Sequence, residues 1–321
     1  MTHTSISIDA IDLRNDQFQI SYMADHRRLT ESIEQIGLIH PVILRSTPPT
    51  EQYQIVSGFQ RVKSCLELNF NRINSIVYLQ DELPDSQAIV LTLHQTATSR
   101  PLNLIEKSLT LRKLISVGQL SETEIMSNMM PVLDLEPNVK IFKNVSELWE
   151  LTDDLKAYIV QNNVALSNAI MFLNFNEEDQ KNLHKLISPL KLGTNRLKEF
   201  LVMIDEMCHR DEIPVHSIID EETNTILSNP DMPTPQKTEV IRSQLKQKRF
   251  PKISSLEKDV QEKLKQLKLP PGLTLSPPPF LEGDRMKVQF EFKNREELDK
   301  IIRKLAEISD DDALAALLEM L

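Results

Sequence analysis

The residues best suited to chemistry lie where a predicted strand runs into a predicted helix. Residues 53–57 are rich in β-branched and aromatic side chains, and Gly58, Phe59, Gln60 and Arg61 follow directly. Glycine lets the backbone approach a ligand, and the first turn of a helix offers N–H groups without intrahelical partners. Arg61 adds a cation where the helix dipole disfavours one. The junction predicts an anion-binding site, although a glycine turn of this kind is also common in purely structural settings.

A second polar group follows about forty residues later in the segment LHQTATSRPLNLIE, residues 93–106. Its polar and basic side chains include His94, Gln95, Thr96 and Arg100. His94 is the side chain in this group that exchanges protons near neutral pH.

Metal and thiol chemistry find little support in the sequence. Cys65 and Cys208 are far apart, and no two of the seven histidines have the spacing of a zinc-binding helix. No run approaches 18 apolar residues, and the N-terminus does not resemble a signal peptide. We therefore expect no metal site, no catalytic set and no membrane segment, and we expect a cytoplasmic protein with two buried thiols.

Charge is unevenly distributed along the chain. The formal net charge is −10, which disfavours a polyanion partner, but residues 236–268 contain ten Lys and Arg against four Asp and Glu. Within this basic segment, Lys246, Lys248 and Arg249 flank Phe250 and are candidates for contacts with DNA. A solvated helix face is the competing interpretation of the same residues.

These groups require elements that hold them, and the hydrophobic pattern predicts an α+β chain. Residues 1–115 alternate between strand and helix patterns, with Gly37 as a left-handed helix cap, and predict a small mixed α/β domain. Residues 116–210 are almost entirely helical. Residues 211–235 contain four prolines and no basic residue, which predicts a linker or extended arm. Residues 236–321 combine basic helices with a final strand and helix.

The helical region predicts a helix-turn-helix. Its first helix spans Ser121–Met130, with Ser121 as N-cap and Glu124 completing a capping box. The recognition helix is expected near residues 137–148, with Pro137 in its first turn. The candidate DNA-contacting side chains there are Asn138, Lys140, Lys143 and Asn144. A helical bundle with an exposed polar face is an equally good interpretation, and Trp149 is expected in the core.

Near the C-terminus, Val288, Phe290 and Phe292 alternate with polar residues and predict one strand, which an amphipathic helix follows. A single strand has unpaired edges, and pairing with a second copy of the chain would satisfy them. We therefore expect a homodimer.

The order of these motifs resembles the ParB-like family, which combines a ParB/sulfiredoxin-type N-terminal domain with a helix-turn-helix domain. The resemblance rests on Ser32-Ile33, Gly37 to Val42, the junction at Gly58–Arg61 and the LNLIE segment at residues 102–106. It continues through LSETEI (residues 120–125), LTDDLK (151–156), VALSNA (164–169) and EEDQ (177–180), and covers roughly residues 5–205.

The resemblance implies a nucleotide pocket, for CTP or another nucleotide with Mg, between a G-E-R-R turn and an E-N-x-x-R box. The turn reads Gly58-Phe59-Gln60-Arg61 in this chain, the Glu-Asn pair of the box falls on Gln95-Thr96, and its arginine falls on Ser99 or on the shifted Arg100. The resemblance thus implies that Gly58 to Arg61, Gln95, Thr96 and Arg100 bind the nucleotide, and both family glutamates are absent. We therefore expect nucleotide binding to be retained and nucleotide hydrolysis to be lost. The sulfiredoxin branch needs a cysteine between the glycine and the arginine of the turn, and Cys65 lies four residues past Arg61.

Our leading hypothesis is a DNA-binding protein of the partition or transcription-regulator type, associated with the nucleoid or a plasmid, with a degenerate nucleotide switch pocket. A partition ATPase is a further possible partner. Two alternatives remain open. One is a nucleoside triphosphatase or nuclease on the same fold, and the other is a phage or plasmid adaptor that binds only protein.

Overall fold

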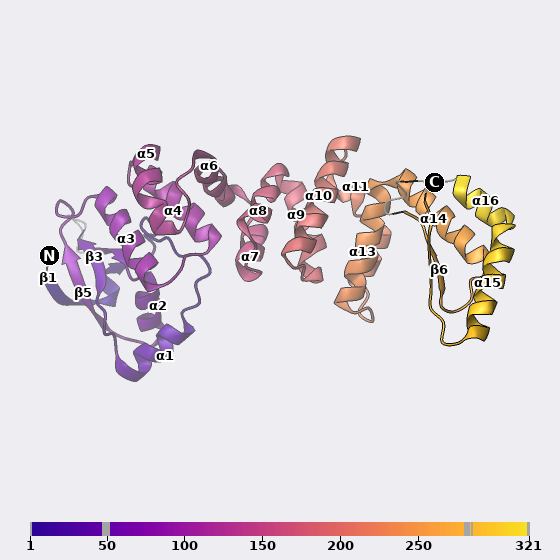
Figure 1. Ribbon diagram of the computed structural model, residues 1–321. Coiled ribbons are helices and arrows are strands. Elements are labelled where there is room, and N and C mark those ends of the chain that lie inside the picture. Colours follow the sequence, from indigo (N-terminus) through magenta and orange to yellow (C-terminus); the bar gives the residue numbers. More distant parts are fainter. Residues whose placement is uncertain (1, 47–51, 279–282, 284, 320–321) are drawn as a thin grey trace. The chain divides into compact units, whose positions relative to one another are not determined.

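The computed structural model describes residues 2–46, 52–278, 283 and 285–319. They form two compact units, Met1–Leu201 and Val202–Leu321 (Figure 1). The first unit combines a mixed sheet with many helices, and the second is helical with a small sheet. The expected α+β fold class is thus confirmed.

The N-terminal sheet has five strands in the order β1-β5-β3-β4-β2. Their bounds are β1 Thr2–Ser7, β2 Ile11–Asp12, β3 Val42–Ser46, β4 Tyr53–Ser57 and β5 Arg72–Tyr78. β1 pairs antiparallel with β5, β5 parallel with β3, β3 antiparallel with β4, and β4 parallel with β2. The interior strands β3 and β4 are almost wholly buried, which explains their β-branched runs.

Helices α1 (Arg27–Ile36), α2 (Phe59–Glu67) and α3 (Asp85–Ser99) accompany this sheet, and a short 3₁₀ turn, η1, spans Ile8–Ala10. Gly37 ends α1 with φ of 79° and ψ of 179°. The expected left-handed cap is therefore wrong in detail, because the chain leaves the helix directly into an extended conformation that only the positive φ of glycine permits.

Short helices make up the rest of the first unit. In chain order they are α4 (Leu104–Ser116), α5 (Glu122–Glu124), η2 (Ile125–Met129), η3 (Pro131–Leu133), α6 (Val139–Glu147), η4 (Leu148–Glu150), α7 (Asp153–Gln161), α8 (Leu166–Ala169), η5 (Ile170–Asn174), α9 (Glu177–Ile187) and η6 (Ser188–Leu190). The capping box of Ser121 and Glu124 is present, and the helix it starts continues through a π-turn at η2. The second helix of the predicted pair begins at Val139 with Asn138 as its N-cap, so Pro137 precedes the helix instead of lying in its first turn as expected.

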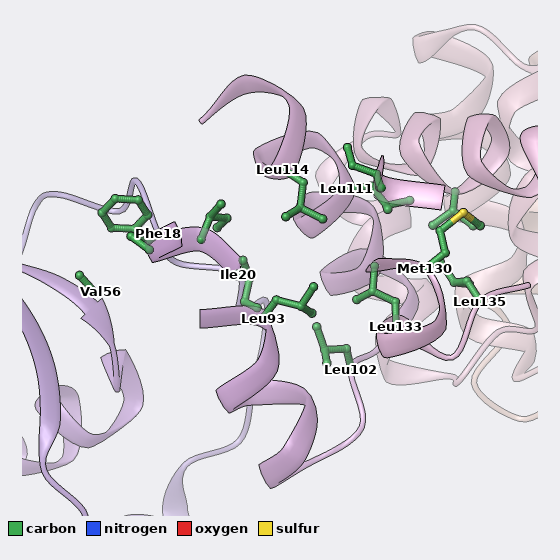
Figure 2. Packing of buried hydrophobic residues seen from close by; sticks show 14 of the residues in the cluster. Phe18, Ile20, Val56, Leu93, Leu102, Leu111, Leu114, Met130, Leu133 and Leu135 are labelled. Carbon is green, nitrogen blue, oxygen red and sulfur yellow. The ribbon is translucent and has the colours of Figure 1, made fainter. Parts of the chain in front are cut away.

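One hydrophobic cluster joins the sheet region to the short helices. Figure 2 shows Val56 from β4, Leu93 from α3, Leu111 from α4 and Leu133 from η3 among its buried side chains. Trp149 packs edge-to-face on Tyr22 with ring centroids 5.9 Å apart, and its neighbours Leu148 and Leu151 are buried. Residues on both sides of the predicted boundary at 115/116 thus share a core; the domain limits themselves stay a prediction.

The second unit begins within α10 (Thr194–Asp211) and continues through α11 (Val215–Ile218), α12 (Glu221–Ser228), α13 (Thr234–Arg249) and α14 (Pro251–Gln266). The expected extended linker at 211–235 is wrong, because this stretch contains α11 and α12. Pro214 and Pro233 occupy helix N-cap positions, and Val215 and Ile218 are buried. The prolines of this stretch predict a break in helical structure, whereas two of them stand at helix N-termini, where proline is well tolerated.

The C-terminal part holds β6 (Leu273–Ser276), β7 (Lys287–Phe290), α15 (Arg295–Ser309) and α16 (Asp312–Glu319). β7 pairs antiparallel with β6. The expectation of a lone strand is therefore wrong, since the short LTLS run supplies a partner from the same chain. Among the helices of the described residues, none has the length and apolar character needed to cross a membrane.

Candidate functional site

A cavity of about 940 Å³ opens where the N-terminal end of β3 and the C-terminal end of β4 meet the start of α2 and the end of α3. All seven side chains predicted to bind a nucleotide line it. They are Gly58, Phe59, Gln60, Arg61, Gln95, Thr96 and Arg100. Two segments more than thirty residues apart in the sequence are thus brought to one site.

Gly58 is required by the backbone at the entrance to α2. Its φ is 101°, in the left-handed region, and a Cβ atom there would lie 3.0 Å from Val42 and 3.1 Å from the Arg61 guanidinium. The space beside the glycine is therefore used by Arg61, which folds back over it. No side chain caps α2, so its first N–H groups remain available at the cavity.

Arg61 is held by oxygens that carry no formal charge. Its Nη1 donates to the carbonyl oxygens of Pro41 (2.6 Å) and His40 (3.2 Å), and its Nη2 donates to Oε1 of Gln95 (3.2 Å). Burial lowers the pKa of this guanidinium, and in the described part of the chain no carboxylate pairs with it. An arginine that is desolvated without a counter-charge favours an anion in the cavity.

Gln95 links the two walls of the cavity. Its Oε1 accepts from Arg61 and also from the hydroxyl of Ser57, a buried residue at the end of β4. The position that the family resemblance aligns with a glutamate thus carries an amide in this chain, and the amide orients Arg61 without neutralising it. Gln60 lies on the same wall, where its Oε1 is buried and has no hydrogen-bond partner among the described residues.

Arg100 lines the opposite wall and is already neutralised. Its Nη1 and Nη2 donate to the two carboxylate oxygens of Glu106 at 2.7 and 2.6 Å, which raises the pKa of Arg100. Glu106 is fully buried and also accepts from the backbone N–H groups of Tyr22 and Asn103. Asn103 completes a capping box at the start of α4. Arg100 therefore lines the cavity and also forms a structural ion pair with Glu106, the Arg100–Glu106 lock.

Several lining residues were missed from the sequence. The segment that carries Asp25 and His26 contributes to the wall, as do His40 and Ser57. His26 Nε2 lies 2.9 Å from Glu67 of α2. Asp25 and His26 lie before α1 in a stretch without a recognisable motif, whereas His40 and Ser57 belong to the segments Gly37 to Val42 and 53–57, from which they could have been assigned to the site.

Cys65 lies on α2 with no exposed surface, and burial raises the pKa of its thiol. A buried neutral thiol is a poor nucleophile. Cys65 does not line the cavity, in agreement with the sequence expectation that it is a packing residue.

The candidate DNA-contacting residues of the central region lie together on α6. Lys140 and Lys143 are exposed, and Lys143 has only a loose contact, 3.9 Å, with Glu147. The side chain of Asn138 accepts from two backbone N–H groups and so caps the helix, while Asn144 is half-buried. Two of the four candidates therefore present free polar ends to solvent.

The candidates in the basic segment occupy the last turn of α13. Lys248 donates to Asp220 (2.7 Å) and to the carbonyl of Ile218 (2.6 Å), and Arg249 pairs with Glu206 and stacks on Phe250. Lys246 is half-buried. The charges of Lys248 and Arg249 therefore hold α13 against neighbouring helices of the second unit.

Several carboxylates lie together at a second cavity. This cavity, of about 450 Å³, lies at the N-terminal ends of α7 and α9 and is lined by Glu150, Asp153, Asp154 and Glu177. Across the residues that the structure describes, no group of three or more His, Cys, Asp or Glu side chains is arranged to hold a metal ion.

Comparison with known families places the described cavity in a named domain. The ParB N-terminal domain family matches residues 2–96. This range contains the whole five-stranded sheet and six of the seven cavity residues predicted from the sequence, with Arg100 just beyond it.

Curated relatives are similar to this chain over more residues than the family model matches. A nucleoid occlusion protein of Oceanobacillus iheyensis is 18% identical over 182 residues, covering 56% of this chain and 60% of that protein. A probable chromosome-partitioning protein ParB of Chlamydia muridarum is 24% identical over 193 residues, covering 58% of this chain and 66% of that protein. The match thus spans about three fifths of the first of these relatives and just under two thirds of the second.

Two solved structures of C-terminally truncated ParB from Caulobacter crescentus are also similar. The complex with CTP-gamma-S is 20% identical with a TM-score of 0.28, over 54% of this chain and 92% of that chain. The complex with the centromeric parS site is 15% identical with a TM-score of 0.36, over 67% of this chain and 95% of that chain.

Proposed function

Because this chain is a divergent member of the ParB-like family, we propose that it is a DNA-binding protein of the partition, nucleoid-occlusion or transcription-regulator type, with an N-terminal cavity that takes a nucleotide. The observation that carries the proposal is the convergence of Gly58–Arg61 and Gln95–Arg100 on one cavity. Association with the nucleoid or with a plasmid follows from the same proposal.

The chemistry of the cavity supports a phosphate-bearing ligand. Its volume of about 940 Å³ lies in the usual range for cofactor and small-molecule sites, roughly 300–1,000 Å³. Arg61 supplies a guanidinium without a carboxylate partner in the described chain, and α2 supplies N–H groups. Both favour a negatively charged group at the start of α2. CTP is the first nucleotide to test, with ATP as the comparison.

DNA would be contacted by the exposed face of α6. Lys140 and Lys143 lie three positions apart on this helix and so point to the same side. The last turn of α13 contributes less, because Lys248 and Arg249 already have carboxylate partners. The acidic cavity at α7 and α9 repels phosphate, which leaves α6 as the better candidate surface of the first unit.

The test measures the affinity of the full chain for random and genomic duplex DNA over a series of salt concentrations. We expect Lys140→Gln/Lys143→Gln to weaken binding and to reduce the slope of log K against log salt by about 1 to 2, one phosphate contact being worth about 0.9. The matched control is Lys181→Gln/Lys185→Gln, which removes two exposed lysines from α9 of the same unit. Equal slopes for the two double variants would contradict the assignment to α6.

Complete absence of salt-dependent DNA binding, with or without CTP, would contradict the DNA-binding proposal as a whole. A single stable protein partner recovered under those conditions would then favour the adaptor alternative. A partition ATPase remains a prediction, and its recovery together with DNA binding would support the partition role.

We also propose that the cavity binds nucleotide without turning it over. Phe59 and Gln95 stand where the family resemblance places glutamates, so the wall lacks the carboxylates that would orient water. His94, exposed on α3, is one of the three histidines in the cavity lining. We expect no phosphate release from CTP or ATP and no cleavage of DNA. Phosphate release that Arg61→Ala abolishes would instead establish the nucleoside triphosphatase alternative.

A homodimer through the β6–β7 region completes the proposal. Val288, Phe290 and Phe292 remain 46%, 39% and 51% exposed, although their alternation is that of a core-facing strand. The outer edge of β7 has no strand partner among the described residues. A second copy would cover these side chains and pair this edge.

Light scattering with size-exclusion chromatography tests the dimer. We expect a dimer for the unaltered chain and a monomer for Val288→Asp/Phe290→Asp. Gln289→Asp is the matched control, because its side chain points to the other face of β7. A monomeric unaltered chain would contradict the dimer, and so would a dimer that both variants retain.

A further inference from the structure

The charges lining the large cavity are strongly one-sided. Among the residues that the structure describes, its lining includes Arg61, Arg100 and three histidines, but only one carboxylate, that of Asp25. A site that binds magnesium together with a phosphate chain normally contributes one or two carboxylates of its own. In this cavity Arg61 is left to face the phosphate chain directly, since Arg100 is already paired with Glu106.

Asp25 is not available as a metal ligand. Its carboxylate accepts from Nη2 of Arg27 at 2.8 Å, from Nε at 3.1 and 3.2 Å, and from the backbone N–H of the same residue at 3.0 Å. The Arg27 guanidinium holds the pKa of Asp25 well below its usual range. The negative charge of Asp25 is therefore already paired with Arg27, two residues further along the chain.

The neutral oxygens at the start of α2 are also occupied. The carbonyls of His40 and Pro41 and the Oε1 of Gln95 all accept from Arg61. A divalent cation bound to them would sit against a guanidinium in a partly desolvated site, where like charges repel strongly. Gln60 Oε1 is one buried acceptor without a partner in the described residues, and one amide oxygen does not make an octahedral site. The residues present do not fit a bound magnesium ion.

We infer that this cavity binds its phosphate-bearing ligand without a divalent cation. Arg61 and the free N–H groups of α2 take the phosphate chain, and Gln60 Oε1 accepts a hydrogen bond from a hydroxyl or amino group of the same ligand. The inference rests on the proposed nucleotide binding and names the manner of that binding. It also explains why the position of Gln95 carries an amide, since a carboxylate there would remove the charge that replaces the metal.

The experiment is calorimetric titration of the full chain with CTP and with inorganic triphosphate, once with magnesium in excess and once with EDTA. We expect the Kd for both ligands to be unchanged or lower in EDTA, because magnesium competes with Arg61 for the phosphate oxygens. Binding of CTP only in the presence of magnesium would overturn the inference while leaving nucleotide binding intact. Absence of binding under every condition would remove the proposed nucleotide function and the inference together.

Gln60→Met separates the two ligands, because it keeps the size of the side chain and removes its acceptor. We expect this variant to weaken CTP by about tenfold, the value of one well-made hydrogen bond, and to leave inorganic triphosphate unchanged. Arg14→Gln is the control for both titrations, since Arg14 is exposed and lies outside the cavity. An equal loss for CTP and triphosphate in Gln60→Met would overturn the role given to Gln60.

Discussion

The two walls of the cavity each present an arginine, and the two arginines have opposite surroundings. On the α2 wall, burial lowers the pKa of Arg61, and its described partners are carbonyl and amide oxygens. On the α3–α4 wall, the buried Glu106 raises the pKa of Arg100 through two short hydrogen bonds. One charge is left for a ligand, and the other holds the fold together. The difference shows that a carboxylate partner, and not the mere presence of arginine, decides which residue can bind an anion.

The largest effect is expected where the lock on Arg100 is broken. Glu106→Gln leaves a half-buried guanidinium without its counter-charge, and removing one partner of a buried pair costs about 3 to 5 kcal/mol of the free energy of unfolding. Urea unfolding followed by circular dichroism measures this loss.

Glu150→Gln is the matched control, because Glu150 forms an ion pair with Arg112 at the surface, where a pair contributes about 0 to 1 kcal/mol. If Glu106→Gln is no more destabilising than Glu150→Gln, Arg100 and Glu106 do not form the lock described here. The folded fraction of Glu106→Gln should also bind CTP at least as tightly as the unaltered chain, since Arg100 then resembles Arg61.

Removal of Arg61 should have the next largest effect, on binding rather than on folding. We expect Arg61→Gln to raise the Kd for CTP by about tenfold to a hundredfold, the range for a lost hydrogen bond to a charged group. Calorimetric titration measures the Kd, and Arg14→Gln controls for the loss of one positive charge. A Kd that Arg61→Gln leaves unchanged would show that the α2 wall is not the anion site.

A sharper test gives Arg61 a carboxylate partner, as Arg100 already has. Gln95→Glu places a carboxylate at a position that now lies 3.2 Å from the Arg61 guanidinium, so Arg61 would be neutralised as Arg100 is. We expect the Kd for CTP to rise by about tenfold, measured by the same titration. Gln161→Glu, an exposed change of the same charge at the end of α7, should leave the Kd unaltered. A Kd for Gln95→Glu within error of this control would contradict the role given to the uncharged Gln95.

Much of this arrangement was visible in the sequence. The mixed α/β character of the N-terminal region, the capping box of Ser121 and the junction at Gly58 were predicted because each depends mainly on neighbouring residues. The seven cavity residues were predicted through two ordered motifs, and the fold brings them together. Whether they bind a nucleotide remains a prediction.

What the sequence could not provide is the partner of each charge. Arg61 and Arg100 look alike in the sequence, and only the packing of α4 places Glu106 beside one of them. The same limit applies to Lys248 and Arg249, whose partners Asp220 and Glu206 lie 28 and 43 positions away. The helices α11 and α12 were missed for a related reason, because burial of Val215 and Ile218 depends on contacts within the second unit.

The smallest effect extends the comparison to the second unit, where Lys248 has the paired character of Arg100. The hydrogen bond from Lys248, with a further one from the backbone of Thr223, lowers the pKa of Asp220 to about 2. Because the unfolded value is about 3.9, the ionised Asp220 contributes stability that is complete above that pH and is lost as the pH falls toward 2. Asp220→Asn keeps a good N-cap for α12 and removes the charge together with the oxygen that accepts from Lys248.

We therefore expect Asp220→Asn to be slightly less stable than the unaltered chain at neutral pH and to lose less stability on acidification from pH 5 to pH 3, in urea unfolding followed by circular dichroism. Asp231→Asn, at an exposed position that caps no helix, should follow the unaltered chain. If Asp220→Asn and Asp231→Asn show the same pH dependence, the ion pair does not hold α12 to α13, and Lys248 would be as free for DNA as Lys140. If only Asp220→Asn changes the pH dependence of stability, Lys248 is paired with a carboxylate in the folded chain, as Arg100 is, and its charge is not available for DNA.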